Sequence, residues 1–216
     1  MKLKQHREIA ITVIGQINPQ LLESFHFNKT AYLFGSMAPD LNCVYPAHRL
    51  DTTRKRFCIH VKRVDNSIMD LIKSFELGVI THYICDYFCY AHSIESVGHK
   101  HIIYENMLKK YFKEYKQEAL SGIEKEELLK IWDKLREESI SRIAPNYSLD
   151  ANSHGKLILN QVKRMNDLYK KEYEVQRHDN WMGSCEQIYK DICYSLFVCK
   201  KTLEWVLSPV ECLRTN

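Results

Sequence analysis

Along most of the chain, apolar residues recur every three or four positions, which is the spacing of an amphipathic helix. The longest stretches of this kind cover residues 5–17, 66–91, 100–120, 125–142, 156–177 and 184–207. No segment alternates apolar and polar residues over the length of a strand. The pattern therefore predicts an all-α fold, a single helical-bundle domain of about six helices over residues 1–216.

The segments between these helices carry turn-forming and charged residues. Residues 19–33 predict short, irregular helix, and the stretch from Gly35 to Asp40 predicts a turn-prone loop. Residues 41–60 contain Pro46, a polar Asp51-Thr52-Thr53 run and a basic Arg54-Lys55-Arg56 run, so we expect a long exposed loop there. Residues 145–155 predict a second loop.

Composition narrows the class of protein. The chain has 216 residues, of which 45% are hydrophobic, and this excludes a disordered protein. Charged residues interrupt every apolar stretch before it could span a membrane. Residues 1–20 lack the features of a secretion signal, which predicts a cytoplasmic protein whose eight cysteines are reduced thiols. The net charge of +4 is too small to indicate a nucleic-acid partner by itself.

Histidine and carboxylate side chains extend three of the predicted apolar faces. In the helix over 66–91, the face formed by Ile68, Ile72, Phe75 and Val79 continues at helical spacing to His82 and Asp86. In the helix over 100–120, the face formed by Leu108, Phe112 and Tyr115 extends backwards to Glu105 and His101. In the first helix, the face of Ala10, Val13 and Ile17 extends backwards to His6.

Buried carboxylates need compensating cations, because an unpaired buried charge costs several kcal/mol. Arg and Lys are absent from these three faces, whereas histidine recurs on all of them. Histidine and carboxylate pairs on facing helices are the arrangement by which helical bundles bind metal ions. The alternative for His82 and Asp86 is a hydrogen-bonded pair that orients a loop.

The spacing of His82 and His92 favours more than one ion. Ten residues of continuous helix span about 15 Å, so one ion cannot bind both unless the helix stops between them. A cluster of ions about 3.5–4 Å apart, as in two-metal hydrolases, accommodates both more easily.

Three segments resemble the zinc-dependent phospholipase C family, which is related in fold to the S1/P1 nucleases. They are Gly35-Ser36-Met37-Ala38-Pro39-Asp40-Leu41, then His82-x3-Asp86-x5-His92, and then His101-x2-Tyr104-Glu105-Asn106. The resemblance covers about residues 5–115. It implies a helical bundle of that family's type.

The resemblance also implies a site with two or three zinc ions. Asp40, His60, His82 and Asp86 would surround one zinc, while His92, His101 and Glu105 would hold a second. His6 and a bridging Asp86 would contribute to a third, although no Trp stands near the start of this chain to complete it. His48 is the rival to His60, and the Phe57-x-x-His60 context favours His60. Phe57 has the spacing of an aromatic that lies near the substrate headgroup in the secreted enzymes, but Leu41 replaces the Tyr that follows the aspartate there.

By the same resemblance, the activity is hydrolysis of a phosphodiester by metal-activated water, with Asp40 as general base. The substrate would be a phospholipid headgroup or another phosphodiester. Such a protein would contact a membrane surface transiently and would need no obligate nucleic acid. Two other functions remain open: a nucleotide or nucleic-acid phosphodiesterase like the S1/P1 nucleases, and a non-catalytic helical metal-binding protein.

Overall fold

The computed structural model describes residues 3–41, 49–93, 99–122, 126–143, 151–176 and 185–208. In these ranges the regular elements are all α-helices, and none of the described residues is in a strand, which confirms the all-α prediction. The helices are α1 (Leu3–Ile14), α2 (Pro19–Ser24), α3 (Lys29–Gly35), α4 (Ala38–Leu41), α5 (Leu50–Asn66), α6 (Asp70–Tyr87), α7 (Tyr90–Ser93), α8 (His99–Gly122), α9 (Glu126–Ile143), α10 (Ala151–Gln176) and α11 (Cys185–Leu207).

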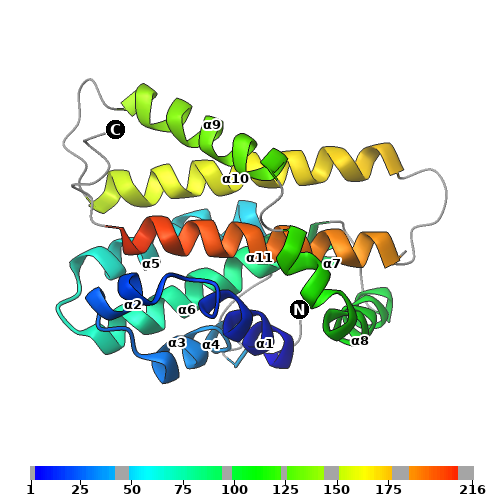
Figure 1. Ribbon diagram of the computed structural model, residues 1–216, viewed down its shortest axis with the longest axis horizontal. Helices are drawn as coiled ribbons and strands as arrows, with labels where there is room; N and C mark the ends of the chain where they lie inside the picture. The colour runs from blue at the N-terminus through cyan, green and yellow to red at the C-terminus, as the bar shows by residue number, and fades with distance from the viewer. Residues whose placement is uncertain are drawn as a thin grey trace.

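Two long helices organise the bundle. Figure 1 shows α11 running through the middle of the molecule, with α10 and α9 stacked on one side of it and α6 with the amino-terminal helices on the other. Helix α11 also packs against α8 and α1, and α5 packs between α6 and α10. The hydrophobic core fills the space between these layers, and its largest fully buried side chains include Tyr32, Tyr83, Phe88, Tyr169 and Phe197.

The second half of α6 is buried on every face. All residues from Leu77 to Tyr87 are buried, because α3, α5 and α11 pack around this segment. The contact with α3 is a direct backbone approach: a Cβ atom added to Gly78 would lie 2.1 Å from the Tyr32 carbonyl oxygen. Only glycine permits this approach, which brings the segment after α3 against the buried end of α6.

The prediction of a loop over residues 41–60 is wrong from residue 50 onwards. Residues from Leu50 onwards form α5, and residues 42–48 lie outside the described residues. The helix buries a stripe of Leu50, Thr53, Phe57, Val61 and Val64 at steps of three and four. The basic residues between these positions led to the prediction of a loop. In the structure they form the solvent-facing side of α5.

The helix expected over residues 66–91 is divided in the structure. It begins at Asp70 and ends at Tyr87, and the separate turn α7 follows. Its predicted apolar face is buried only towards the carboxyl end: Val79 is buried, whereas Ile72 is exposed and Ile68, which precedes the helix, is 95% exposed. The start of α6 extends beyond the helices that cover its second half, so helical spacing alone overestimated its burial.

Other boundaries differ less. The irregular segment 19–33 covers α2 and most of α3, whose first turns are capped by the side chains of Asn18 and Asn28. The turn-prone loop contains the short helix α4, and α10 starts at Ala151, inside the second predicted loop. The remaining expected helices match α1, α8, α9, α10 and α11 within a few residues. Among the described residues, no helix combines the length and apolar character needed to cross a membrane.

Candidate metal centre

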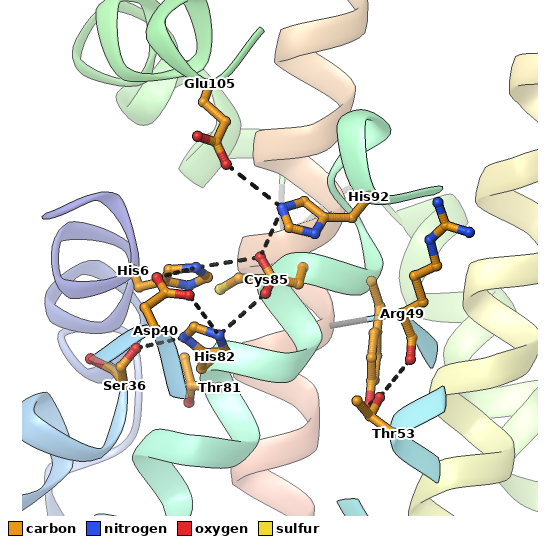
Figure 2. Close-up of polar contacts among 12 residues, drawn as sticks. His6, Ser36, Asp40, Arg49, Thr53, Thr81, His82, Cys85, His92 and Glu105 are labelled. Carbon is orange, nitrogen blue, oxygen red and sulfur yellow. Dashed lines mark hydrogen bonds and ion pairs between the residues drawn. The ribbon is translucent and has the colours of Figure 1, made fainter. Parts of the chain in front are cut away.

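Three potential ligands converge where α1, α4 and α6 meet, and we call His6, Asp40 and His82 the first ligand group. One nitrogen or oxygen atom from each residue lies within 4.8 Å of the other two. The His6 and His82 rings are stacked with their centroids 3.8 Å apart. Their Nε2 atoms each lie 3.6 Å from an oxygen of Asp40. Figure 2 shows the two rings beside the Asp40 carboxylate.

The orientation of His82 follows from the loop after α3. Its Nδ1 lies 3.0 Å from the carbonyl oxygen of Ser36. Because a carbonyl only accepts hydrogen bonds, Nδ1 carries a proton and donates it to Ser36, and Nε2 is the ring atom that faces the group. A backbone acceptor that fixes the tautomer in this way is typical of histidines that bind metals.

His6 is the least satisfied polar side chain of the group. It is fully buried, and neither of its ring nitrogens makes a hydrogen bond. Burial, together with the neighbouring His82, lowers the pKa of His6 to about 3, so its ring is neutral at pH 7. A buried imidazole without hydrogen-bond partners is costly, and coordination to a metal ion would satisfy it.

Asp86 lies between the first ligand group and His92. Its Oδ1 is 3.3 Å from Nε2 of His6 and 3.5 Å from Nε2 of His92, while its Oδ2 is 3.2 Å from Nε2 of His82. The break in the helix after Tyr87 makes this possible, because it allows His92 to fold back over Asp86. Asp86 therefore contacts three histidines, one each from α1, α6 and α7.

His92, His101 and Glu105 form the second ligand group, and their ligand atoms also lie within 4.8 Å of one another. Nε2 of His101 is 2.9 Å from Oε1 of Glu105, and Nε2 of His92 is 3.8 Å from the same oxygen. The His92 and His101 rings meet edge to face with centroids 4.7 Å apart. Figure 2 shows His92 between Glu105 and the first ligand group.

The protonation states favour cation binding. Burial lowers the pKa of His92. Burial alone would raise the pKa of Asp86, but the surrounding histidines, His92 foremost, hold it well below the usual carboxyl range. Burial opposes ionisation of Glu105 in the same way, yet hydrogen bonds with His101 and His92 lower its pKa below the ordinary value. Neutral imidazoles beside anionic carboxylates are the protonation states that metal binding requires.

The donor set therefore fits zinc. Imidazole nitrogens and carboxylate oxygens are preferred zinc ligands, and each group supplies two imidazoles and one carboxylate, with Asp86 between them. Buried His6 provides a further indication, since its Nδ1 makes no hydrogen bond and its Nε2 faces oxygens of Asp86 at 3.3 Å and of Asp40 at 3.6 Å.

The structure brings together seven of the eight residues expected as ligands, and His60 is the exception. Its Nδ1 contacts the carboxylate of Glu76, which Arg63 also contacts, and His60 is in neither ligand group. The rival His48 lies outside the described residues. Phe57, expected near a substrate headgroup, is fully buried in the core and packs against Tyr87.

Sequence reasoning missed two residues that support the site. Ser36 was only part of a motif, and its role through a backbone carbonyl leaves no trace in residue type. Gln5 is buried, and its Nε2 donates to the backbone carbonyl of Glu105 at 3.0 Å, which ties α1 to α8 beside the second ligand group. Its position on the buried face of the first helix, next to His6, was the available signal.

Comparison with known proteins agrees with this geometry. A family model described as zinc-dependent phospholipase C matches residues 6–174, a range that contains every member of both ligand groups. Searches of curated proteins and of solved structures find no match.

Proposed function

The chain belongs to the zinc-dependent phospholipase C family, and on that premise we propose that it is a zinc-dependent phosphodiester hydrolase that cleaves the headgroup from a phospholipid. The observation that carries the proposal is the continuous array of histidines and carboxylates from Asp40 to His101, joined by Asp86. A purely structural metal site would need only one such group, whereas two adjacent groups match the arrangement of hydrolytic two-metal centres.

In this proposal, His6, Asp40 and His82 hold one zinc, His92, His101 and Glu105 hold a second, and Asp86 contacts both groups. Zinc at these positions would make water a nucleophile near neutral pH and would offset the negative charge of the phosphate. We also include a third zinc ion beside His6 in the proposal, so that each chain binds two or three zinc ions.

The chain's own residues have separable roles. The backbone carbonyl of Ser36 holds the proton of His82 at Nδ1, so that Nε2 is the ring atom that faces Asp40 and Asp86. The side chain of Asp40 is 20% exposed, whereas those of His6 and His82 are fully buried. Asp40 is thus the member of the first ligand group that water and substrate can reach, and we assign it the orientation and deprotonation of the attacking water.

The position of Phe57 counts against both substrates, because a ring buried in the core can contact neither a phospholipid headgroup nor a stacked base. A nuclease of single strands needs exposed aromatic surfaces for base stacking. Phe57, the aromatic beside the basic run of α5, is buried in the core and cannot supply one. The preference for a phospholipid therefore comes from the family description.

The test uses the purified full-length chain loaded with zinc. Metal analysis should find at least two zinc ions per chain. Phosphatidylcholine in mixed micelles should release diacylglycerol and the phosphorylated headgroup, and a chelator should abolish the release. His82→Ala should lower turnover by at least about 100-fold, in line with loss of a metal ligand.

His26→Asn is the matched control, because His26 is exposed, lies in neither group and has a positive φ that asparagine tolerates. It should retain wild-type turnover. Cleavage of single-stranded DNA with intact micelles would replace the phospholipase proposal with the nuclease one. Tight zinc binding without hydrolysis of either substrate would indicate a non-catalytic metal protein.

A further inference from the structure

A buried carboxylate outside both ligand groups lies at the centre of a hydrogen-bond network. Asp191 is on α11 and is fully buried. Its Oδ2 accepts hydrogen bonds from the backbone N–H of Tyr90 at 2.7 Å and from the hydroxyl of Tyr104 at 2.6 Å. Its Oδ1 accepts from the hydroxyl of Tyr169 at 2.7 Å and from Nε2 of Gln187 at 3.0 Å. Four donors compensate the charge that burial would otherwise penalise.

The two oxygens of Asp191 serve different parts of the molecule. Tyr90 is the first residue of α7, which carries His92 two positions later. Tyr104 is on α8 directly before Glu105. Oδ2 therefore joins the two separate elements that supply the second ligand group. Oδ1 accepts from Gln187 of α11 and from Tyr169 of α10, and neither helix contributes a ligand to either group.

The second ligand group needs such a tether. Helix α7 has four residues, and a helix of a single turn has no stability of its own. The position of His92 relative to Glu105 is consequently set by tertiary contacts. The Tyr90 and Tyr104 rings also pack together, with centroids 5.6 Å apart, and this contact adds to the hydrogen bonds that join α7 and α8. Metal ligands must be held to within about 0.5 Å of the productive geometry.

We propose that Asp191 is a positioning residue for the second ligand group, which holds α7 against α8 so that His92, His101 and Glu105 bind one metal ion. The proposal rests on the metal-binding role proposed above. It adds α11 to the site, although Asp191 lies beyond the residues matched by the family model.

Two tyrosines that bond to the same carboxylate provide the test. Tyr104→Phe and Tyr169→Phe each remove one hydroxyl from a buried tyrosine and one hydrogen bond from Asp191. Both variants are made in a His82→Ala background, which disables the first ligand group. Zinc is then titrated into the metal-free full-length chain against a chromogenic chelator, so that the affinity measured is that of the second group. Circular dichroism and urea unfolding of each metal-free variant report its stability.

Tyr104→Phe should weaken zinc binding by about 10- to 100-fold, the usual effect of losing a residue that orients metal ligands. Tyr169→Phe should change the affinity by less than about threefold, even where the two variants lose similar stability. Asp191→Asn should weaken binding at least as much as Tyr104→Phe, because its amide nitrogen cannot accept hydrogen bonds.

Equal effects of the two tyrosine variants on zinc affinity would overturn the positioning role, as would unchanged affinity in Tyr104→Phe. If Asp191→Asn fails to fold, the tyrosine pair still decides the question. If the wild-type chain binds no zinc, the proposed function and this inference are refuted together. If it binds zinc but the two tyrosine variants have the same zinc affinity, only the inference is refuted.

Discussion

The backbone contact between α3 and α6 leads to a sharp prediction for Gly78→Ala. The new Cβ atom would lie 2.1 Å from the carbonyl oxygen of Tyr32, 2.6 Å from the backbone nitrogen of Ser36 and 2.9 Å from the carbonyl carbon of Gly35. Ordinary contact begins at 3.4 Å, so the nearest atom is more than 1 Å too close. All three atoms are backbone atoms of α3 and the residue after it, and no side-chain rotation can relieve the overlap.

The consequence is a displacement of α3 by roughly 1 Å from α6, and overpacking of this kind destabilises a protein by about 1–3 kcal/mol. We expect the upper end of that range, because the clash is with backbone. The displacement also moves Ser36 away from His82 and shifts Asp40, which follows on α4. Zinc affinity of the first ligand group should therefore fall by at least about tenfold.

Urea unfolding of the metal-free chain measures the stability term, and zinc competition with a chelator measures the affinity. Gly15→Ala is the matched control, because its Cβ would have nearest neighbours at 3.5 Å, an ordinary contact. It should leave the free energy of unfolding within about 0.5 kcal/mol of wild type. A Gly78→Ala protein as stable as Gly15→Ala, with unchanged zinc affinity, would refute the described packing of α3 on α6.

Three further predictions concern the metal, the core and alkaline pH. Zinc held at 1,000 times its dissociation constant should raise the free energy of unfolding by about 4 kcal/mol, and chelation should remove this gain; a melting temperature insensitive to chelator contradicts it. Phe57→Ala should lower the free energy of unfolding by about 3–5 kcal/mol and leave the KM of the folded enzyme unchanged, whereas Ile68→Ala, at an exposed position, should shift it by less than about 0.5 kcal/mol. A raised KM in a stable Phe57→Ala protein would place that ring at the substrate. Burial raises the pKa of the Cys89 thiol, so this group stays protonated in the folded chain while the unfolded chain loses the proton above about pH 8.5. Cys89 thus leaves the free energy of unfolding unchanged at lower pH and decreases it as pH rises above about 8.5. In urea unfolding at pH 9–11, Cys89→Ala should make the fall of this free energy with pH shallower by about 1.4 kcal/mol per pH unit. An unchanged slope would contradict the buried thiol.

Much of the metal centre was predictable because its ligands extend helical faces. His82 and Asp86 are one turn apart, as are His101 and Glu105, and residues at this spacing share a face whatever the tertiary structure is. The carboxylates on buried faces without Lys or Arg then required another source of positive charge. The amino-acid sequence by itself therefore determined the all-α class and the local ligand pairs.

Longer-range relations depended on the packing. In one continuous helix, His82 and His92 would be too far apart to share a site. The end of α6 at Tyr87 brings them together, but the apolar pattern of the sequence continues past Tyr87 and does not predict this helix end. The start of α6 looked as apolar as its end, yet only the second half is covered by α3, α5 and α11. Burial depends on which helices pack around a face, and this is not a property of the face alone.

His60 and Asp191 illustrate the same division. His60 has the residue type of a ligand but contacts Glu76, a residue 16 positions away that only folding brings near. Asp191 is far from every ligand in sequence, yet one of its oxygens bonds to both elements that carry the second ligand group. Helical periodicity relates residues within about one turn, so the sequence determined the pairs on each helix. The tertiary structure alone decided which pairs meet, because that depends on close packing between helices distant in the chain.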